Sequence, residues 1–184
     1  MSLFEFLMIL LSIIVGLGIS ELLTGFARIL RTGRLSELCL AHGALLLTLF
    51  MALLQVFWEG WYLGEATHWT FTALVLLLTA PILLYLATHI VIPEDSGEPL
   101  ADYYFAKSRM IYALLVLAAT MGMLFKTLAF GAPLFIVDNI TSFPTIGILA
   151  ALAWSKNRWL HNILVPTCLV LLVLDTVTIS NEIR

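Results

Sequence analysis

The sequence predicts an all-α membrane protein, a bundle of six transmembrane helices with both chain ends on the outer side. Three observations predict this fold class. The chain of 184 residues is 61% hydrophobic and only 11% charged, whereas soluble domains carry about 25% charged residues. Its apolar residues gather into six stretches near the length of about 20 residues that a spanning helix needs. Its Lys and Arg residues fall mainly on alternate sides of those stretches.

The six expected helices form a single transmembrane domain over residues 1–184. They cover residues 4–30, 40–63, 69–92, 103–130, 133–154 and 159–179. Pro81, Pro144 and Pro166 fall in the third, fifth and sixth helices, where each removes a backbone donor and is expected to kink its helix. Asp138, Asn139 and Pro144 interrupt the first half of the fifth helix, so a broken or half-membrane helix is the alternative there.

Basic residues predict the orientation. Seven of the nine basic residues lie at the end of the first helix or near the connections between the third and fourth helices and between the fifth and sixth helices: Arg28, Arg31, Arg34, Lys107, Arg109, Lys156 and Arg158. Because cytoplasmic loops collect Lys and Arg, this end, with the acidic loop 93–102, is expected in the cytoplasm, and a bacterial inner membrane is the expected location. Aromatic belts at both interfaces agree with these spans: Trp58, Trp61 and Trp69 outside, Trp154 and Trp159 inside.

Ionisable side chains inside the spans are the main functional signal, because each costs roughly 2.5–3.5 kcal/mol to insert into a bilayer. The orientation sorts them by depth into an outer and an inner layer. The outer layer comprises Glu5, Glu59, Lys126, Asp138 and Asp175. Four acids and one base at similar depth predict an outward-facing cavity with negative excess, which would attract cations.

The predicted binding residues of this cavity are Asp138, Asp175, Glu59, Lys126, Gln55 and Asn139, with Glu21 as a second, inner station. Gln55 and Glu59 share a helix face at a spacing of four, and Lys126 is the internal counter-charge. Two alternatives stand beside this interpretation. Lys126 could form a structural bridge with an aspartate or extend its amine to the membrane surface, and Glu5 and Glu59 could be solvated at the headgroup level.

Three histidines lie near the inner ends of the helices: His42, His89 and His161. Imidazole can ligate a metal ion or a b-type haem. The alternative is that each ring bonds separately to a headgroup or a carbonyl group. No other residues in the sequence imply a cofactor.

A stripe of small residues marks the first helix at a spacing of four: Ser12, Gly16, Ser20 and Thr24. Such stripes let two helices approach closely. Packing inside the bundle is the favoured interpretation, and a homo-oligomer interface is the alternative. Gly18 and Gly25 form a second notch.

These patterns predict a small transporter or channel that moves a proton, a cation or a cationic solute within the lipid bilayer. The alternatives are a non-catalytic structural, sensory or assembly subunit, and a membrane-embedded enzyme or haem-binding electron carrier. Catalysis has little support, because the chain has no HExxH or GxSG motif. Nucleic-acid binding would need a basic patch that the chain lacks.

Overall fold

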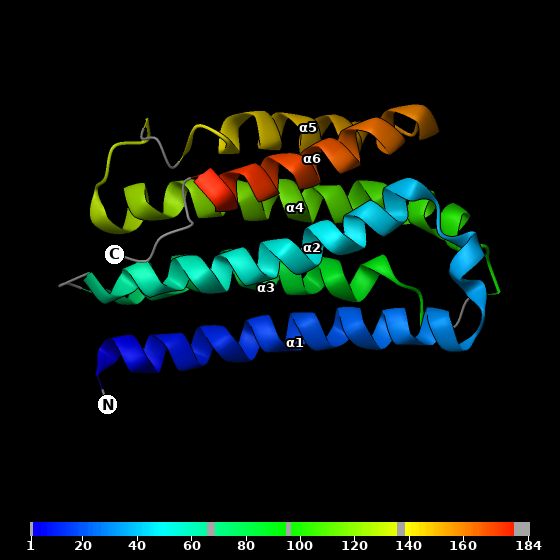
Figure 1. Cartoon of the computed structure of the whole chain (residues 1–184). Helices are drawn as coiled ribbons and strands as arrows, with labels where there is room; N and C mark the ends of the chain where they lie inside the picture. The colour runs from blue at the N-terminus through cyan, green and yellow to red at the C-terminus, as the bar shows by residue number, and fades with distance from the viewer. Residues whose placement is uncertain (1, 66–68, 95–96, 136–138, 179–184) are drawn as a thin grey trace.

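The computed structural model describes residues 2–65, 69–94, 97–135 and 139–178, and the regular secondary structure in these ranges is helical (Figure 1). The α-helices are α1 (Leu3–Arg31), α2 (Leu40–Glu59), α3 (Phe71–Val91), α4 (Leu100–Phe130), α5 (Ser142–Trp154) and α6 (Arg158–Thr178). Two short 3-10 helices, η1 (Arg34–Glu37) and η2 (Gly60–Glu65), follow α1 and α2. Five of the α-helices are long and apolar enough to cross a membrane, which indicates an integral membrane protein.

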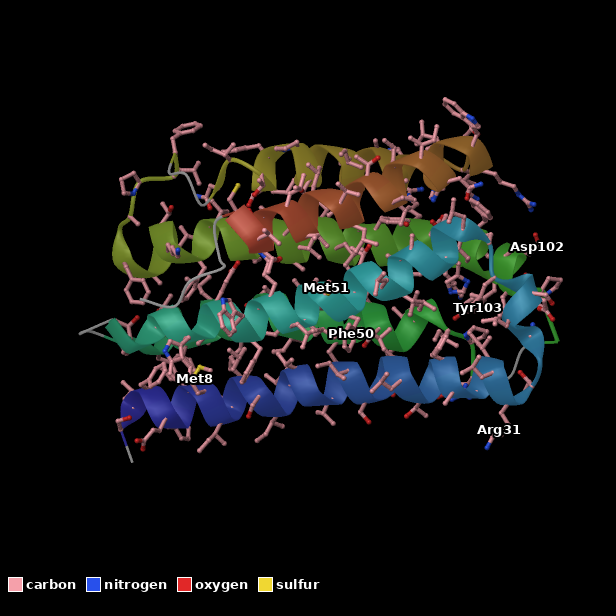
Figure 2. The ribbon with its side chains drawn as sticks, viewed as in Figure 1. Met8, Arg31, Phe50, Met51, Asp102 and Tyr103 are labelled. Carbon is pink, nitrogen blue, oxygen red and sulfur yellow. The ribbon has the colours of Figure 1, made fainter. Side chains whose placement is uncertain are left out.

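The helices lie side by side along one common direction, with α1 at one edge of the bundle and α5 at the opposite edge (Figure 1). Helix α1 packs on α2 and α3, α3 packs on α4, α4 on α5, and α2 on α6. The start of α1 and the end of α6 lie at the same end of the bundle. Arg31 and Asp102 both lie at the other end, Arg31 on α1 and Asp102 on α4 (Figure 2).

Helix α5 differs from the prediction. A full span over residues 133–154 with a kink at Pro144 was expected, but the helix begins at Ser142 and has 13 residues. Helix α4 ends at Phe130 and is capped by Gly131, whose φ of 70° is left-handed backbone that favours glycine. Pro144 is the third residue of α5, in the first turn, where a missing N–H interrupts no helical hydrogen bond. The shorter helix named as the alternative agrees with the structure, and Pro144 does not interrupt it.

The other two prolines that were expected inside helices lie there, Pro81 in α3 and Pro166 in α6. Helix α2 ends at Glu59 and continues as η2, which covers the last residues of the predicted second span. Helix α4 begins at Leu100, three residues before the predicted start.

Glycines on the inward face of α1 allow its close packing. A Cβ atom added at Gly25 would lie 2.6 Å from Ile92 Cδ1, and one added at Gly18 would lie 3.0 Å from Leu53 Cδ1. Only glycine therefore fits these two positions without displacing a neighbour. The predicted stripe of Ser12, Gly16, Ser20 and Thr24 is exposed throughout. The expectation that this stripe packs inside the bundle is wrong, because the second notch occupies the inward face.

Hydrogen bonds from arginines fasten the loops at the basic end. Arg28 Nη1 donates to the carbonyl oxygens of Pro93 at 3.0 Å and Glu94 at 2.8 Å. Arg158 Nη2 lies 2.9 Å from Asp102 Oδ1. Arg34 donates to the Glu37 carboxylate, and this hydrogen bond lowers the pKa of Glu37. The basic residues thus hold the connections between helices on this side of the bundle.

Candidate binding cavity

A cavity of about 540 Å³, the central cavity, lies between α2, α3, α4, α5 and α6. Its apolar wall consists mostly of small side chains and leucines: Ala52, Val56, Ala80, Leu84, Leu115, Ala118, Ala119, Gly122, Met123, Leu149, Cys168 and Leu172. Its polar groups are Thr48, Gln55, Glu59, Lys126, Asn139, Thr141, Ser142, Thr145 and Asp175. The charged groups therefore lie toward one end of the cavity, and its deeper part is mostly apolar apart from Thr48 and Thr145.

Asp175 is the buried charge at the polar end, with an exposed fraction of 9%. Its Oδ2 atom accepts a hydrogen bond from Gln55 Nε2 at 2.6 Å, and its Oδ1 atom accepts one from Thr141 Oγ1. Gln55 Nε2 also donates to Glu59 Oε1 at 2.9 Å. One amide group therefore bridges two carboxylates, using both of its N–H donors.

Helix geometry explains why these groups meet. Gln55 and Glu59 are four residues apart on α2 and share one face. Helix α6 packs on α2 and brings Asp175, three residues before its end, to the same level. Thr141 immediately precedes α5, so the short helix positions its hydroxyl group against the carboxylate.

Five of the seven predicted binding residues line this cavity: Gln55, Glu59, Lys126, Asn139 and Asp175. Asn139 is 7% exposed, and its side chain donates to the Leu134 carbonyl oxygen at 2.7 Å. Asp138 lies outside the described residues. Most residues at the polar end of the cavity are therefore among those that the sequence places at one depth in the membrane.

Glu21 is placed elsewhere. Its Oε1 atom lies 3.1 Å from His89 Nδ1, and the pair joins α1 to α3. Both side chains are partly exposed on the outside of the bundle, at 36% and 52% respectively. Glu5 caps the start of α1 in a reciprocal pair with Ser2. These two acids do not line the central cavity.

Sequence analysis missed Thr141 and the small side chains of the apolar wall. Thr141 falls in the stretch predicted as the fifth helix (residues 133–154), and the sequence assigned it no role. Ala118, Gly122 and Lys126 follow one another at a spacing of four on α4. Two small residues, one and two helical turns before a lysine inside the membrane span, were therefore the available signal for a cavity on that face of α4.

Each of the three histidines has its own partner. His42 Nε2 donates to the Val91 carbonyl oxygen at 2.9 Å, His89 pairs with Glu21, and His161 Nε2 donates to the Ser155 carbonyl oxygen at 2.8 Å. No group of three or more His, Cys, Asp or Glu side chains in the described ranges could hold a metal ion. His42 and His161 thus bond separately to carbonyl groups, as the alternative to a ligand cluster predicts, whereas His89 pairs with a carboxylate group instead.

A second cavity of about 270 Å³ lies at the basic end, beside Arg28, Thr32 and Arg34. The guanidinium groups there already donate to backbone carbonyl oxygens and to Glu37. The central cavity is the larger of these two cavities, and five of the seven predicted binding residues line it.

The fold and the site together define a helical membrane protein with a central cavity that carries carboxylates at one end. Comparison with protein-family models, with curated proteins and with solved structures gives no match for the chain.

Proposed function

We propose that this protein moves a proton, a cation or a cationic solute across the membrane through the central cavity. The observation that carries the proposal is the position of Asp175, a buried carboxylate that lines a cavity between five helices. Charged groups inside membrane bundles are costly and typically mark substrate or ion pathways.

The cavity extends well below the polar end. On α6 it is lined by Asp175 and, seven residues earlier, by Cys168. At a rise of 1.5 Å per residue, this spacing corresponds to roughly 10 Å along the helix axis. A solute at Asp175 would therefore have space to move toward the middle of the bilayer.

The charges at the polar end favour a cation. The described lining residues include two carboxylates, Glu59 and Asp175, and one ammonium group, Lys126. Negative excess in a water-excluded cleft concentrates cations. Lys126 is then a counter-charge within the site, and a moving cation would compete with its ammonium group for the carboxylates.

The proposed direction follows from the basic residues. Arg28, Arg34 and Arg158 lie at the end of the bundle opposite to Asp175. Under the positive-inside rule, that end faces the cytoplasm, both termini face outward, and the polar end opens to the outside of a bacterial inner membrane.

The test is a charge-movement measurement on purified protein in proteoliposomes adsorbed to a solid-supported membrane. Rapid jumps in pH, in Na⁺ or K⁺ and in organic cations would be applied on the cavity side. We expect a current from the wild type that Asp175→Asn abolishes. The matched control is Glu5→Gln, which removes an acid at similar depth outside the cavity and should leave the current unchanged. A structural subunit, the competing hypothesis, gives folded protein without current for every cation tried.

A further inference from the structure

The size of the central cavity exceeds what a proton or a metal ion needs. A coordinated metal ion is held by oxygen atoms at about 2.0–2.6 Å, whereas the described wall is largely aliphatic. Pockets for organic molecules measure about 300–1,000 Å³ and combine an apolar wall with a few placed polar groups. The central cavity, at about 540 Å³, has that size and composition.

Gln55 indicates which polar group the ligand carries. Its amide nitrogen donates to two carboxylates, Glu59 and Asp175. Because carboxylates only accept hydrogen bonds, the nitrogen must face them and the oxygen must face away. That oxygen, Gln55 Oε1, is buried and has no hydrogen-bond partner within the described ranges. A buried acceptor without a partner costs about 1–3 kcal/mol, so a ligand that donates a hydrogen bond there is favoured.

Asp175 retains capacity to accept a further hydrogen bond. Each of its oxygens accepts one bond, from Gln55 or from Thr141, and a carboxylate offers about four lone-pair sites. Asp175 and Gln55 both line the central cavity, so a charged donor there has two acceptors among the lining side chains, this carboxylate and Gln55 Oε1. Charge-assisted hydrogen bonds of this kind are roughly twice as strong as neutral ones.

We propose that the central cavity binds an organic amine. Its protonated primary or secondary ammonium group donates to Asp175 and to Gln55 Oε1, and its apolar body lies against Leu84, Leu115 and Ala118. This inference names the substrate class and rests on the proposed function only for the statement that the amine is transported. The source of the ammonium group is a free amine or the headgroup of phosphatidylethanolamine.

Binding is measured apart from transport, by calorimetric titration of the protein in phosphatidylcholine and phosphatidylglycerol nanodiscs. The probes are phenethylamine, its trimethylammonium analogue and 2-phenylethanol. We expect phenethylamine to bind at least about tenfold more tightly than the other two, which is a difference of about 1.4 kcal/mol. The quaternary analogue keeps the charge and loses the N–H donors, and the alcohol loses the charge.

Two variants locate the site. Asp175→Asn should weaken phenethylamine binding at least about tenfold. Gly122→Leu should also remove binding, because Gly122 lines the cavity and no described atom lies within 4 Å of a Cβ added there. Gly147→Leu is the matched control: Gly147 has the same open surroundings but does not line the cavity, and its variant should bind normally.

The outcomes separate this inference from the proposed function. Cation currents without amine binding overturn the inference and leave transport standing. Amine binding without current supports the inference and counts against transport. Equal binding of all three probes, or binding that survives Gly122→Leu, overturns the inference. Adding phosphatidylethanolamine to the nanodiscs identifies the source of the ammonium group. If the lipid competes with phenethylamine, the ammonium group belongs to the lipid; if it does not compete, the ammonium group belongs to a free amine.

Discussion

At the scale of single residues, the hydroxyl group of Tyr104 joins α4 to α6 through a chain of hydrogen bonds. His161 Nε2 must donate to the Ser155 carbonyl oxygen, so Nδ1 of the neutral ring is an acceptor. Tyr104 therefore donates to His161 Nδ1 at 2.7 Å and accepts from Tyr112 at 2.8 Å. All three side chains are at most 1% exposed.

This direction predicts unequal effects for two conservative variants. Tyr104→Phe leaves a buried acceptor on His161 and a buried donor on Tyr112 unpaired, and should lower the free energy of unfolding by about 1–3 kcal/mol. Tyr112→Phe leaves the bond from Tyr104 to His161 intact and should cost about 1 kcal/mol or less. Thermal unfolding in one detergent measures both. Equal losses would contradict this direction of the hydrogen bonds.

Glu37 provides a pH-dependent attachment at the basic end. Its carboxylate accepts bonds from Arg34 and, at 3.2 Å, from the backbone N–H of Leu100 at the start of α4. Hydrogen bonding to Arg34 lowers the pKa of Glu37 below its ordinary value of about 4.3. A lowered pKa means that the attachment is present above the ordinary pKa and is lost as the pH falls through the lowered one.

Amide hydrogen exchange should report this loss. The protection factor of the Leu100 amide is expected to fall as the pH drops through the lowered pKa of Glu37. The Glu37→Gln variant keeps an oxygen that can accept from Leu100 but does not titrate, so its protection should not change over the same pH range. The amide of Ala73 is the internal control, because it donates to the uncharged Thr70 hydroxyl group at the start of α3. A pH-dependent change of the same size at Ala73 would argue against the role of Glu37.

Local spacing made some residue contacts predictable from the sequence, and others depended on packing. The pairing of Gln55 with Glu59 follows from a spacing of four in one helix. The contact between Gln55 and Asp175 spans 120 residues. The sequence places these two residues at a similar depth in the membrane. Whether their side chains meet depends on the rotation of each helix about its axis, and that rotation depends on the whole packed interface.

At the scale of helices, α1 shows why facing direction was hard to predict. Its two stripes of small residues are equally compatible with close helix packing. The contacts of Gly18 with Leu53 and of Gly25 with Ile92 select the inward one. The length of α5 was ambiguous for a similar reason, since a proline fits either a helix interior with a kink or the first turn.

A pair of glycine variants tests which stripe packs inward. Gly25→Leu should lower the free energy of unfolding by about 1–3 kcal/mol through overpacking, because its Cβ would lie 2.6 Å from Ile92 Cδ1. Gly16→Leu should preserve or raise stability by up to about 1 kcal/mol, the gain in helix propensity, because no described atom lies within 4 Å. Thermal unfolding compares the two. Destabilisation of both variants alike would contradict the assignment.

The same variants bear on the predicted homo-oligomer. If the exposed stripe joins two copies of the chain, Gly16→Leu should lower the particle mass measured by light scattering without lowering thermal stability. An unchanged mass would remove the stripe as an interface.

At the scale of the whole molecule, composition and apolar length were enough to predict a helical membrane bundle, because the bilayer permits few other spanning folds. The positions of charges along each helix were enough to predict a polar layer. The cavity below that layer was not predictable, since its wall consists of alanines, leucines and a glycine that also suit a filled core. Empty space is a property of how helices fit together, so the spacing of Ala118, Gly122 and Lys126 permits a cavity without requiring one.

The last prediction concerns the direction in which the cavity opens. Single cysteines would be placed at Ser2, before α1, and at Ser36 in η1, in a background where Cys39 and Cys168 are replaced by alanine; both serines are exposed. An impermeant maleimide applied to spheroplasts should label Ser2→Cys at once and Ser36→Cys only after permeabilisation, because seven basic residues at the Ser36 end favour the cytoplasmic side for that end. The reverse labelling would turn the polar end of the cavity toward the cytoplasm, and Asp175 would then meet cations leaving the cell rather than those arriving from outside.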